Sequence, residues 1–427
     1  MRLLWITERF PPDIGGVARS SGRIVRSLTA LGISVDVVTW SRYLDPGVIL
    51  PPEASPVDNP NVRVHRIGLY RNWDMTMPHT LNLLDWLHTQ QSFDGVWGHY
   101  LFPAGFVAAW FAKMNGLFSV VSARGNDIDR GMFPPGDFAR LQWTLANATA
   151  VTAVSQEMAK KVETLGGGSV SSVPTPIAER RVVNVLPNVV DVDLFHPSDQ
   201  ERIPKQAMAN QTMANQTIAN QTMALKERLG ILPEESVLGF SGELREKKGQ
   251  RFLLQALSDV RAQRPACLLI MGELRPESQV LLQQFSSAHP DTGARVIVTS
   301  HLDTPAQVAE HLRLCDVYLQ PSLWDGMPNA LLEAMACGCG CIGSDAGGIS
   351  EVIEHGVTGF IVARSHLHRL GEATLEYLKL APHQRAEIGH NASEQIATRF
   401  TLAREQAMLK QLMVTLMPDW QPHERLD

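Results

Sequence analysis

Two carboxylate residues in the second half of the chain lie in a sequence context that suits binding of a ligand with hydroxyl and anionic groups. Asp325 lies in a loop with Gly326 and Pro328, and Glu333 lies in the helix-forming run that follows. The free N–H groups at the start of that helix, near Asn329, would attract an anion. Two other interpretations stay open. Asp before Gly is also an ordinary turn signal, and Glu333 could be a solvated helix residue or a capping partner of Asn329.

The elements around these residues alternate between strand and helix. The β-prone run Val317 to Leu319 predicts a strand, and Ala330 to Cys337 predicts a helix. Cys341-Ile342 is typical of a second buried strand, and a short helix is expected between Gly347-Gly348 and Gly356. This βαβα order predicts a parallel sheet with ligands at the carboxyl ends of its strands.

The same stretch resembles the nucleotide-sugar site of family 4 glycosyltransferases, which have the two-domain GT-B fold. In that family the motifs P-S, acid-G-x-P, L-L-E-A-M-A-x-G and G-G-x-x-E occur in this order. The match covers Pro321, Ser322, Asp325, Gly326, Pro328, Leu331 to Ala336, Gly338, Gly347, Gly348 and Glu351. One departure is Asp325, where the family usually has Glu.

The resemblance implies roles for the two carboxylates. Glu333 is expected to accept hydrogen bonds from the ribose hydroxyls of a nucleotide-sugar donor, and Asp325 to lie beside the transferred sugar. The other donor-binding residues that we expect are Gly242, Gly326, Met327, Pro328, Asn329, Ala330 and Leu331.

A basic loop after the first strand of the second half could compensate the charge of a leaving diphosphate. The family has a Gly-Arg-Leu…Lys-Gly pattern here, and this chain has Glu243 in place of the Arg. We expect Lys248 to bind the diphosphate, with Arg245 or Lys247 supplying the missing charge and Glu243 pointing away or pairing with Arg245. The alternative is an exposed run of charges at a helix start.

The first half carries a second set of candidate residues for the acceptor or a phosphate. Gly15-Gly16 before a helix would let the backbone approach an anionic group, although a plain tight turn is the alternative. His99 follows a strand, and its role is either structural or in a ligand cleft. Arg124, Gly125 and Asp127 match the family's His-Gly-x-Asp, with Arg124 in place of His, so Arg124 could bind a phosphate or an acidic acceptor.

The order of elements predicts an α/β protein with two Rossmann-like, doubly wound domains facing an interdomain cleft. We expect a first domain over 1–190, completed by a C-terminal helix at about 395–427, and a second domain over 191–394 with a low-complexity insertion at 203–225. The run from Ala392 to Met417 is typical of one long helix. In the first half the predicted strands are Leu3 to Thr7, Val35 to Trp40, Val62 to Ile67, Gly95 to Gly98, Ser119 to Ser122 and Ala150 to Val154.

Composition restricts the class of protein. The 427 residues are 44% hydrophobic with a net charge of −6, which argues against a disordered chain and against a nucleic-acid binder. Glu8 ends the first apolar run at once, unlike a signal peptide, and the longest apolar stretch, Phe102 to Ala112, is short of the roughly 20 residues that span a bilayer. We expect a cytoplasmic protein, with a peripheral membrane contact through Arg19, Arg23 and Arg26 as one option.

Two patterns resemble metal-binding motifs, and neither is favoured. Cys337, Cys339 and Cys341 cross a helix-to-strand joint without a His cluster, so they are expected to behave as small buried hydrophobes. Asp127-x-Asp129 and Asp191-x-Asp193 match the metal motif of GT-A glycosyltransferases, but the second-domain pattern is far longer.

The segment Met208 to Thr222 repeats a five-residue unit, Met/Ile-Ala-Asn-Gln-Thr. A period of five advances about 140° per repeat around a helix, so its apolar residues form no stripe. We therefore expect that deleting this segment changes the melting temperature and donor binding very little. A melting temperature many degrees lower in the deletion variant would show that the repeat is a packed element.

Together these patterns predict a retaining glycosyltransferase with Asp325, Lys248 and Arg245 as catalytic residues. The donor would be a UDP- or GDP-sugar and the acceptor a saccharide or lipid-linked saccharide, with no further cofactor. Two alternatives are a glycoside hydrolase that uses Asp325 and Glu333 as acid and base, and a non-catalytic nucleotide-sugar-binding protein.

Overall fold

The computed structural model describes residues 1–54, 59–125, 127–128, 134–167, 183–197 and 222–422. The chain divides into two compact units, Met1–Asn188 with Leu402–Asp427, and Val189–Thr401. We call them unit 1 and unit 2. The repeat at 208–222 lies outside the described residues except for Thr222, and the residues from 222 to 228 are helical.

Unit 1 is built on an eight-stranded sheet in the order β3-β4-β2-β1-β5-β6-β7-β8. All neighbours pair in parallel except β3 and β4. The strands are β1 (Arg2–Thr7), β2 (Ser34–Ser41), β3 (Glu53–Ala54), β4 (Val62–Gly68), β5 (Gly95–His99), β6 (Phe118–Ala123), β7 (Ala150–Ala153) and β8 (Val183–Val185). The order reverses at β1, so the crevice between β1 and β5 is where a doubly wound sheet binds ligands.

Helices cover both faces of this sheet because successive strand residues point to opposite sides. Leu3 packs on one face with α1 and α16, and Leu4 packs on the other face with α2 and α3. The helical elements with described bounds in unit 1 are α1 (Gly16–Ala30), α2 (Trp73–Gln90), η1 (Leu101–Gly105), α3 (Phe106–Asn115), α5 (Pro135–Asn147), α6 (Gln156–Gly167) and α16 (Leu402–Leu416).

A buried ion pair joins α16 to α1. Glu405 is fully buried and accepts hydrogen bonds from Arg23 Nε at 2.8 Å and from Ser27 Oγ at 2.8 Å. The Arg23 side chain is only 12% exposed. Arg23 is therefore used inside unit 1 and is not part of an exposed basic face with Arg19 and Arg26, on which the option of a peripheral membrane contact rested.

Unit 2 contains a six-stranded, fully parallel sheet in the order β11-β10-β9-β12-β13-β14. Its strands are β9 (Ser236–Ser241), β10 (Ala266–Met271), β11 (Val296–Val298), β12 (Val317–Gln320), β13 (Cys341–Ser344) and β14 (Phe360–Val362). The order reverses at β9, so the loops after β9 and β12 lie beside each other. The loop after β9 carries Arg245 and Lys248, and we call it the basic loop. The loop after β12 carries Asp325, and we call it the acid loop.

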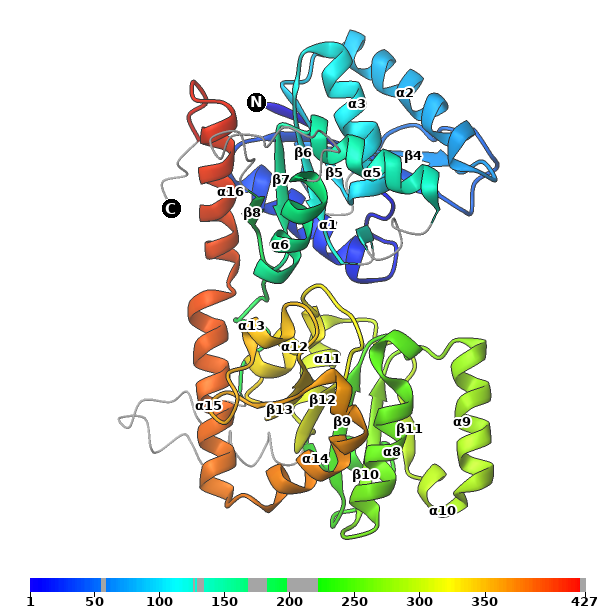
Figure 1. Ribbon diagram of the computed structural model, residues 1–427, viewed down its shortest axis with the longest axis vertical. Helices are drawn as coiled ribbons and strands as arrows, with labels where there is room; N and C mark the ends of the chain where they lie inside the picture. The colour runs from blue at the N-terminus through cyan, green and yellow to red at the C-terminus, as the bar shows by residue number, and fades with distance from the viewer. Residues whose placement is uncertain (55–58, 126, 129–133, 168–182, 198–221, 423–427) are drawn as a thin grey trace. The chain divides into compact units, whose positions relative to one another are not determined.

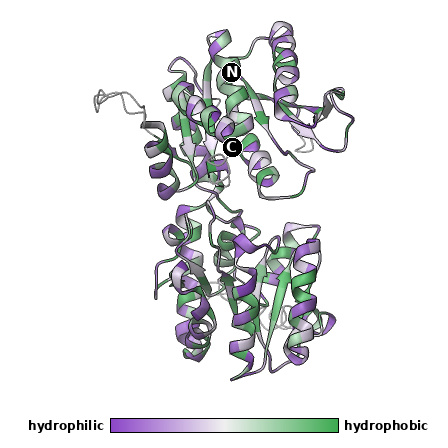
Figure 2. Ribbon diagram, turned by 45° about the vertical axis from the view of Figure 1, so that its right-hand side comes forward, coloured by the Kyte–Doolittle hydropathy of each residue, from purple (hydrophilic) through white to green (hydrophobic). Residues whose placement is uncertain are grey.

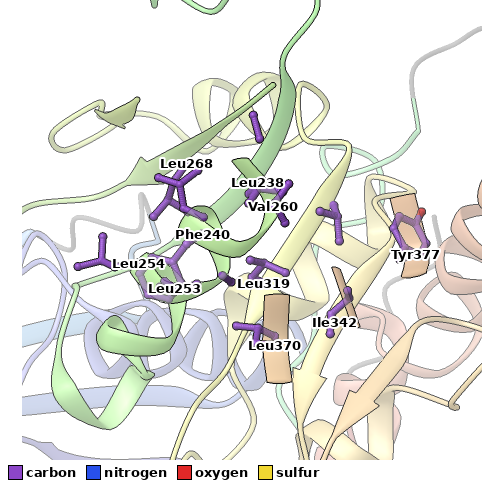
Figure 3. Close-up of a cluster of buried hydrophobic side chains, with 14 of the residues drawn as sticks. Leu238, Phe240, Leu253, Leu254, Val260, Leu268, Leu319, Ile342, Leu370 and Tyr377 are labelled. Atoms are coloured by element: carbon purple, nitrogen blue, oxygen red, sulfur yellow. The ribbon is translucent and has the colours of Figure 1, made fainter. Parts of the chain in front are cut away.

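The core of unit 2 lies between the sheet and its covering helices. Figure 3 shows Leu238 and Phe240 of β9 with Leu253 of α8, and Ile342 of β13 near Tyr377 of α14. In Figure 2 the strands of unit 2 are mainly hydrophobic, whereas its helices mix hydrophilic and hydrophobic residues. Besides the helical residues from 222 to 228, the described helices of unit 2 are η3 (Glu246–Lys248), α8 (Gln250–Arg261), α9 (Pro276–Ala288), α10 (Pro290–Gly293), α11 (Pro305–Leu312), α12 (Asn329–Ala336), α13 (Ile349–Val352), η4 (Arg364–Arg369), α14 (Leu370–Lys379) and α15 (Pro382–Arg399).

The C-terminal region is two helices, α15 and α16, where the sequence predicted one from Ala392 to Met417. The break lies at Phe400 and Thr401. Val190 N donates a hydrogen bond to Phe400 O at 2.9 Å, and Thr401 forms a β-bridge with Val190. These contacts with an extended segment replace the continuing helix and end α15 at Arg399.

The cysteines near the acid loop are buried, free thiols. Burial raises the pKa of the Cys337 thiol to about 12, and it raises the pKa values of Cys339 and Cys341 well above the usual value of a thiol. Within the described ranges, no cluster of three or more His, Cys, Asp and Glu side chains could hold a metal ion. None of the helices in those ranges combines the length and apolar character needed to cross a bilayer.

Candidate active site

Asp325 and Lys248 form an ion pair at the carboxyl ends of β12 and β9. The side chains are 14% and 20% exposed, so both are mostly desolvated yet still accessible. Ser322 Oγ donates to Asp325 Oδ2 at 3.3 Å, and Gly326 N donates to Asp325 Oδ1 at 3.0 Å. The structure thus brings together two residues that lie far apart in the sequence and were both predicted to be catalytic.

A chain of buried hydrogen bonds runs from strand β12 to the acid loop and holds the loop in place. Tyr318 Oη donates to Gln320 Oε1 at 3.0 Å, and Gln320 Nε2 donates to Ser322 Oγ at 2.8 Å. All three side chains are at most 1% exposed. Sequence reasoning missed Gln320 as a functional residue, although a polar residue at the end of the apolar strand β12 was a usable signal. We infer that Tyr318 and Gln320 position Asp325 through Ser322.

Two glycines after β13 make room for the acid loop. Gly347 has φ +54°, and a Cβ at this position would overlap with the carbonyl oxygen of Asp325. Gly348 N donates to Gly326 O at 2.5 Å. The family motif G-G-x-x-E therefore acts here by letting the backbone pack directly under the loop that carries Asp325.

Replacing Gly347 by Ala is expected to destabilise unit 2 and to lower transfer activity. Gly356 offers a matched control, because it also has a positive φ, of +80°, but nothing lies within 4 Å of a Cβ added there. Both variants carry backbone strain, and only Gly347→Ala adds overpacking, which costs about 1–3 kcal/mol. Chemical denaturation of both variants measures the difference. Equal stabilities would mean that Gly347 does not support the acid loop.

The basic loop is held against the acid loop by the backbone. Leu323 N donates to Lys247 O at 2.8 Å. Gly249 has φ +76°, and a Cβ there would overlap with the carbonyl oxygen of Pro321. The Lys-Gly part of the motif therefore has a structural reason: only Gly at 249 lets Lys248 approach Asp325.

Glu243 pairs with two arginines, Arg245 and Arg275. The predicted pairing with Arg245 is confirmed, while Arg275, in the loop before α9, was not found from the sequence. Burial lowers the pKa of Arg245, and its Nε atom has no hydrogen-bond partner among the described residues. Gly242, which begins this loop, has φ +123° and open space where a Cβ would lie. Glu243 therefore neutralises arginine charge beside the site.

The helix after the acid loop begins without a side-chain cap. Pro328 occupies the N-cap position of α12, and no side chain accepts a hydrogen bond there. Asn329 Oδ1 is buried and has no partner among the described residues. Glu333 is only 7% exposed, so its interpretation as a solvated helix residue is wrong. Met327, Ala330 and Leu331, predicted to bind the donor, are also buried, at 4%, 9% and 0% exposure.

In unit 1, Gly15 and Gly16 begin α1. Gly15 is the N-cap residue with φ +129°, a conformation that favours glycine, whereas nothing lies within 4 Å of a Cβ added at Gly16. Arg9 Nη1 donates to Ile14 O at 3.0 Å and braces the preceding loop. The backbone conformation requires glycine only at Gly15.

Asp127 is used by the backbone of its own loop. It accepts hydrogen bonds from Arg124 N at 3.1 Å, Gly125 N at 2.8 Å and Leu101 N at 3.2 Å. Desolvation raises the pKa of Asp127, and these backbone hydrogen bonds oppose the shift. Its carboxylate therefore has a structural role in shaping the Arg124 loop. Asp129, its partner in the metal motif, lies outside the described residues.

His99 is fully buried at the end of β5, where it lies 5.1 Å from the ring of Trp5 and hydrogen-bonds Ser20 Oγ at 3.0 Å. Burial lowers its pKa well below the usual value, and Arg124 and Arg23 lower it further. The next residue, Tyr100, has φ +130°, a strained conformation for a bulky residue and one that often marks functional sites. Sequence reasoning had no signal for this strain.

Comparison with known protein families decides the identity of the fold and the general activity. The model described as "Glycosyl transferase 4-like domain" matches residues 15–176, and the model described as "Glycosyl transferases group 1" matches residues 235–379. The chain belongs to the family 4-like glycosyltransferases. It is a glycosyltransferase of the GT-B type with two Rossmann-like domains, as the motifs predicted.

Relatives extend this assignment over most of the glycosyltransferase. The chain is 25% identical over 398 residues to N-acetyl-alpha-D-glucosaminyl L-malate synthase of Bacillus anthracis, covering 91% of both chains. It is also 25% identical to a GDP-mannose-dependent phosphatidylinositol monomannoside mannosyltransferase of Corynebacterium glutamicum, again over 91% of both. Among solved structures, HepE of Anabaena in complex with UDP-glucose has a TM-score of 0.73 at 17% identity and covers 97% of this chain and 100% of its own.

Proposed function

We propose that the glycosyltransferase moves a hexosyl group from a UDP- or GDP-sugar to a saccharide or lipid-linked saccharide, with retention of anomeric configuration. The observation that carries this proposal is the Lys248–Asp325 ion pair at the strand-order reversal of unit 2. There a cation that would bind a diphosphate lies next to a carboxylate that would contact a sugar. The names of two similar proteins, one GDP-mannose-dependent and one bound to UDP-glucose, support a nucleotide-sugar donor.

Different residues of unit 2 would contact different parts of the donor. Lys248 and the uncapped N-terminus of α12 would face the two phosphates, where negative charge increases as the glycosidic bond breaks. Arg245 is a weaker candidate because Glu243 already compensates its charge. Buried Glu333 would accept hydrogen bonds from the ribose hydroxyls, which change little during the reaction. Asp325 would contact the transferred sugar.

Binding of the donor requires a rearrangement of charge within this site. Lys248 pairs with Asp325 in the structure, so a diphosphate that binds Lys248 competes with this carboxylate. Asp325 then becomes available to the sugar, still oriented by Ser322 and Gly326. Most of the rate would come from such positioning and from stabilisation of the leaving diphosphate.

The geometry disfavours a hydrolase that uses Asp325 and Glu333 as acid and base. A glycoside hydrolase has no diphosphate to bind, so it would not need the cation Lys248 beside Asp325 or the uncapped N-terminus of α12. The peripheral membrane contact is not part of the proposal, because Arg23 is engaged with Glu405.

The proposal is tested by thermal unfolding with a panel of UDP-, GDP- and ADP-sugars, since a ligand that binds the folded state raises its melting temperature. We expect stabilisation by UDP- or GDP-sugars, and a smaller shift in Lys248→Ala. Proton NMR of the product formed with a saccharide acceptor then gives the anomeric configuration. Stabilisation by no nucleotide sugar, or an inverted product, would contradict the proposal.

A further inference from the structure

Two arginines of unit 1 converge on one amide oxygen. Arg124 Nη2 donates to Asn188 Oδ1 at 2.5 Å, and Arg23 Nη2 donates to the same atom at 3.3 Å. A neutral amide oxygen does not compensate two positive charges that are held this close. Proximity to Arg23 and burial together lower the pKa of Arg124 to about 10, with burial the larger cause.

The charge in this cluster is only partly balanced. Arg23 has a carboxylate partner in Glu405. Arg124 forms no ion pair with any carboxylate in the described part of the chain. Glu405, which also attracts it, is paired with Arg23, and Asp127 is occupied by backbone N–H groups. One positive charge in a half-buried setting is therefore left to attract an anion.

A buried imidazole supplies an additional polar atom. His99 Nε2 is used by Ser20, while His99 Nδ1 is fully buried and has no hydrogen-bond partner among the described residues. Ser20, which hydrogen-bonds His99, lies three residues before Arg23 on α1, and the charges of Arg124 and Arg23 add to burial in lowering the pKa of His99. A buried polar atom without a partner is costly unless a ligand or water satisfies it.

The cluster lies where a doubly wound sheet binds ligands. His99 ends β5, Arg124 follows β6, Asn188 follows β8, and Arg23 lies on α1, which follows β1. His99, Arg124 and Asn188 are at the carboxyl ends of strands, Arg23 reaches Asn188 from the middle of α1, and β1 and β5 flank the reversal of strand order. The cluster is thus at the ligand-binding edge of the domain expected to hold the acceptor.

We propose that Arg124, with Arg23, Asn188 and His99, binds an oxyanion carried by the acceptor, either a carboxylate or a phosphate ester. The planar guanidinium of Arg124 suits both groups, because its N–H donors match two oxygens at once. This inference rests on the proposed function, because the bound oxyanion is taken to be part of the acceptor of a glycosyl transfer. The anion-binding site itself can be tested without any donor.

The experiment measures how acetate and dimethyl phosphate raise the melting temperature of the full chain at constant ionic strength. Arg124→Gln removes the charge and shortens the side chain but keeps a planar group with N–H donors. We expect the dissociation constant of the anion to rise at least about 10-fold in this variant, as for loss of a charge-assisted hydrogen bond. Arg124→Lys, which keeps the charge without the planar fork, should fall between Arg124→Gln and the wild type.

Two controls locate the site. Arg26→Gln removes an exposed charge from the same helix as Arg23 and should bind the anion as the wild type does. Arg124→Gln is also compared with Arg124 in a Lys248→Ala background, which removes any anion binding at the proposed diphosphate ligand of unit 2. The proposal is overturned if the wild type binds neither anion, if Arg124→Gln binds as tightly as the wild type, or if Lys248→Ala alone loses binding. Tighter binding of acetate supports a carboxylate acceptor, and tighter binding of dimethyl phosphate supports a phosphate ester.

The same protein samples separate this inference from the proposed function. Titration with UDP and GDP reports on unit 2, and we expect Arg124→Gln to retain this binding. Loss of anion binding in Arg124→Gln would support the acceptor site even if neither nucleotide bound, in which case only the proposed function would fail.

Discussion

An Asp325→Asn variant is expected to lose about 100- to 1,000-fold in kcat, the usual loss when one preorganised group facing the transition state is removed. Asp325 is held in place by Ser322, Gly326 and Lys248, so the amide will occupy the same position without the charge. The affinity for the bare nucleoside diphosphate should not fall, because that ligand has no sugar for Asp325 to contact and Lys248 is freed.

The control for this variant is Asp291→Asn. Asp291 is exposed in α10, which leads into the amino end of β11. The site lies at the carboxyl ends of the strands, on the other side of the sheet from α10. Steady-state kinetics of Asp291→Asn should match the wild type. Asp325→Glu restores the residue usual in the family and should keep more activity than Asp325→Asn. An Asp325→Asn enzyme with unchanged kcat would remove this carboxylate from the reaction.

A Lys248→Ala variant is expected to lose roughly 10- to 150-fold in kcat/KM, corresponding to one charge-assisted hydrogen bond of about 1.5–3 kcal/mol to the diphosphate. The exposed Arg251 on the adjacent helix α8 provides a control for the loss of one positive charge, and Arg251→Ala should be close to wild type. Unchanged kinetics in Lys248→Ala would move the phosphate site elsewhere, with Arg245 the next candidate.

The double variant Lys248→Ala with Asp325→Asn tests the coupling between the two residues. Neighbouring residues in one ion pair usually show interaction energies of about 0.5–3 kcal/mol. We expect the combined loss in kcat/KM to be smaller than the product of the single losses. Strictly multiplicative effects would mean that the ion pair plays no part in catalysis.

The parts of the site that were predictable from the sequence are those whose signals are local. The acid loop, α12 and the glycine pair after β13 occur in one continuous stretch with known motif order. The glycines illustrate this well: Gly347 and Gly249 are specified by close backbone approach, which other residue types cannot provide. The sequence therefore indicated both the fold and the loop that carries Asp325.

The features that were missed depend on contacts between distant positions. Arg275 reaches Glu243 from another loop, and Arg23 pairs with Glu405, 382 positions away, which reversed the interpretation of its helix face. The break between α15 and α16 arises from the pairing of Thr401 with Val190. Helix propensity alone predicts that the helix continues through Phe400 and Thr401, because propensity does not include tertiary hydrogen bonds.

Calorimetry with bare UDP and GDP tests most directly whether unit 2 binds a nucleoside diphosphate through Lys248 and Glu333. Asp325 is expected to contact the sugar and not the bare nucleotide. We predict that one of these nucleotides binds the wild type and that Lys248→Ala and Glu333→Gln weaken this binding. Asp325→Asn should bind at least as tightly as the wild type. Absence of binding to the wild type, or an equal loss of affinity in Asp325→Asn and Glu333→Gln, would contradict the account.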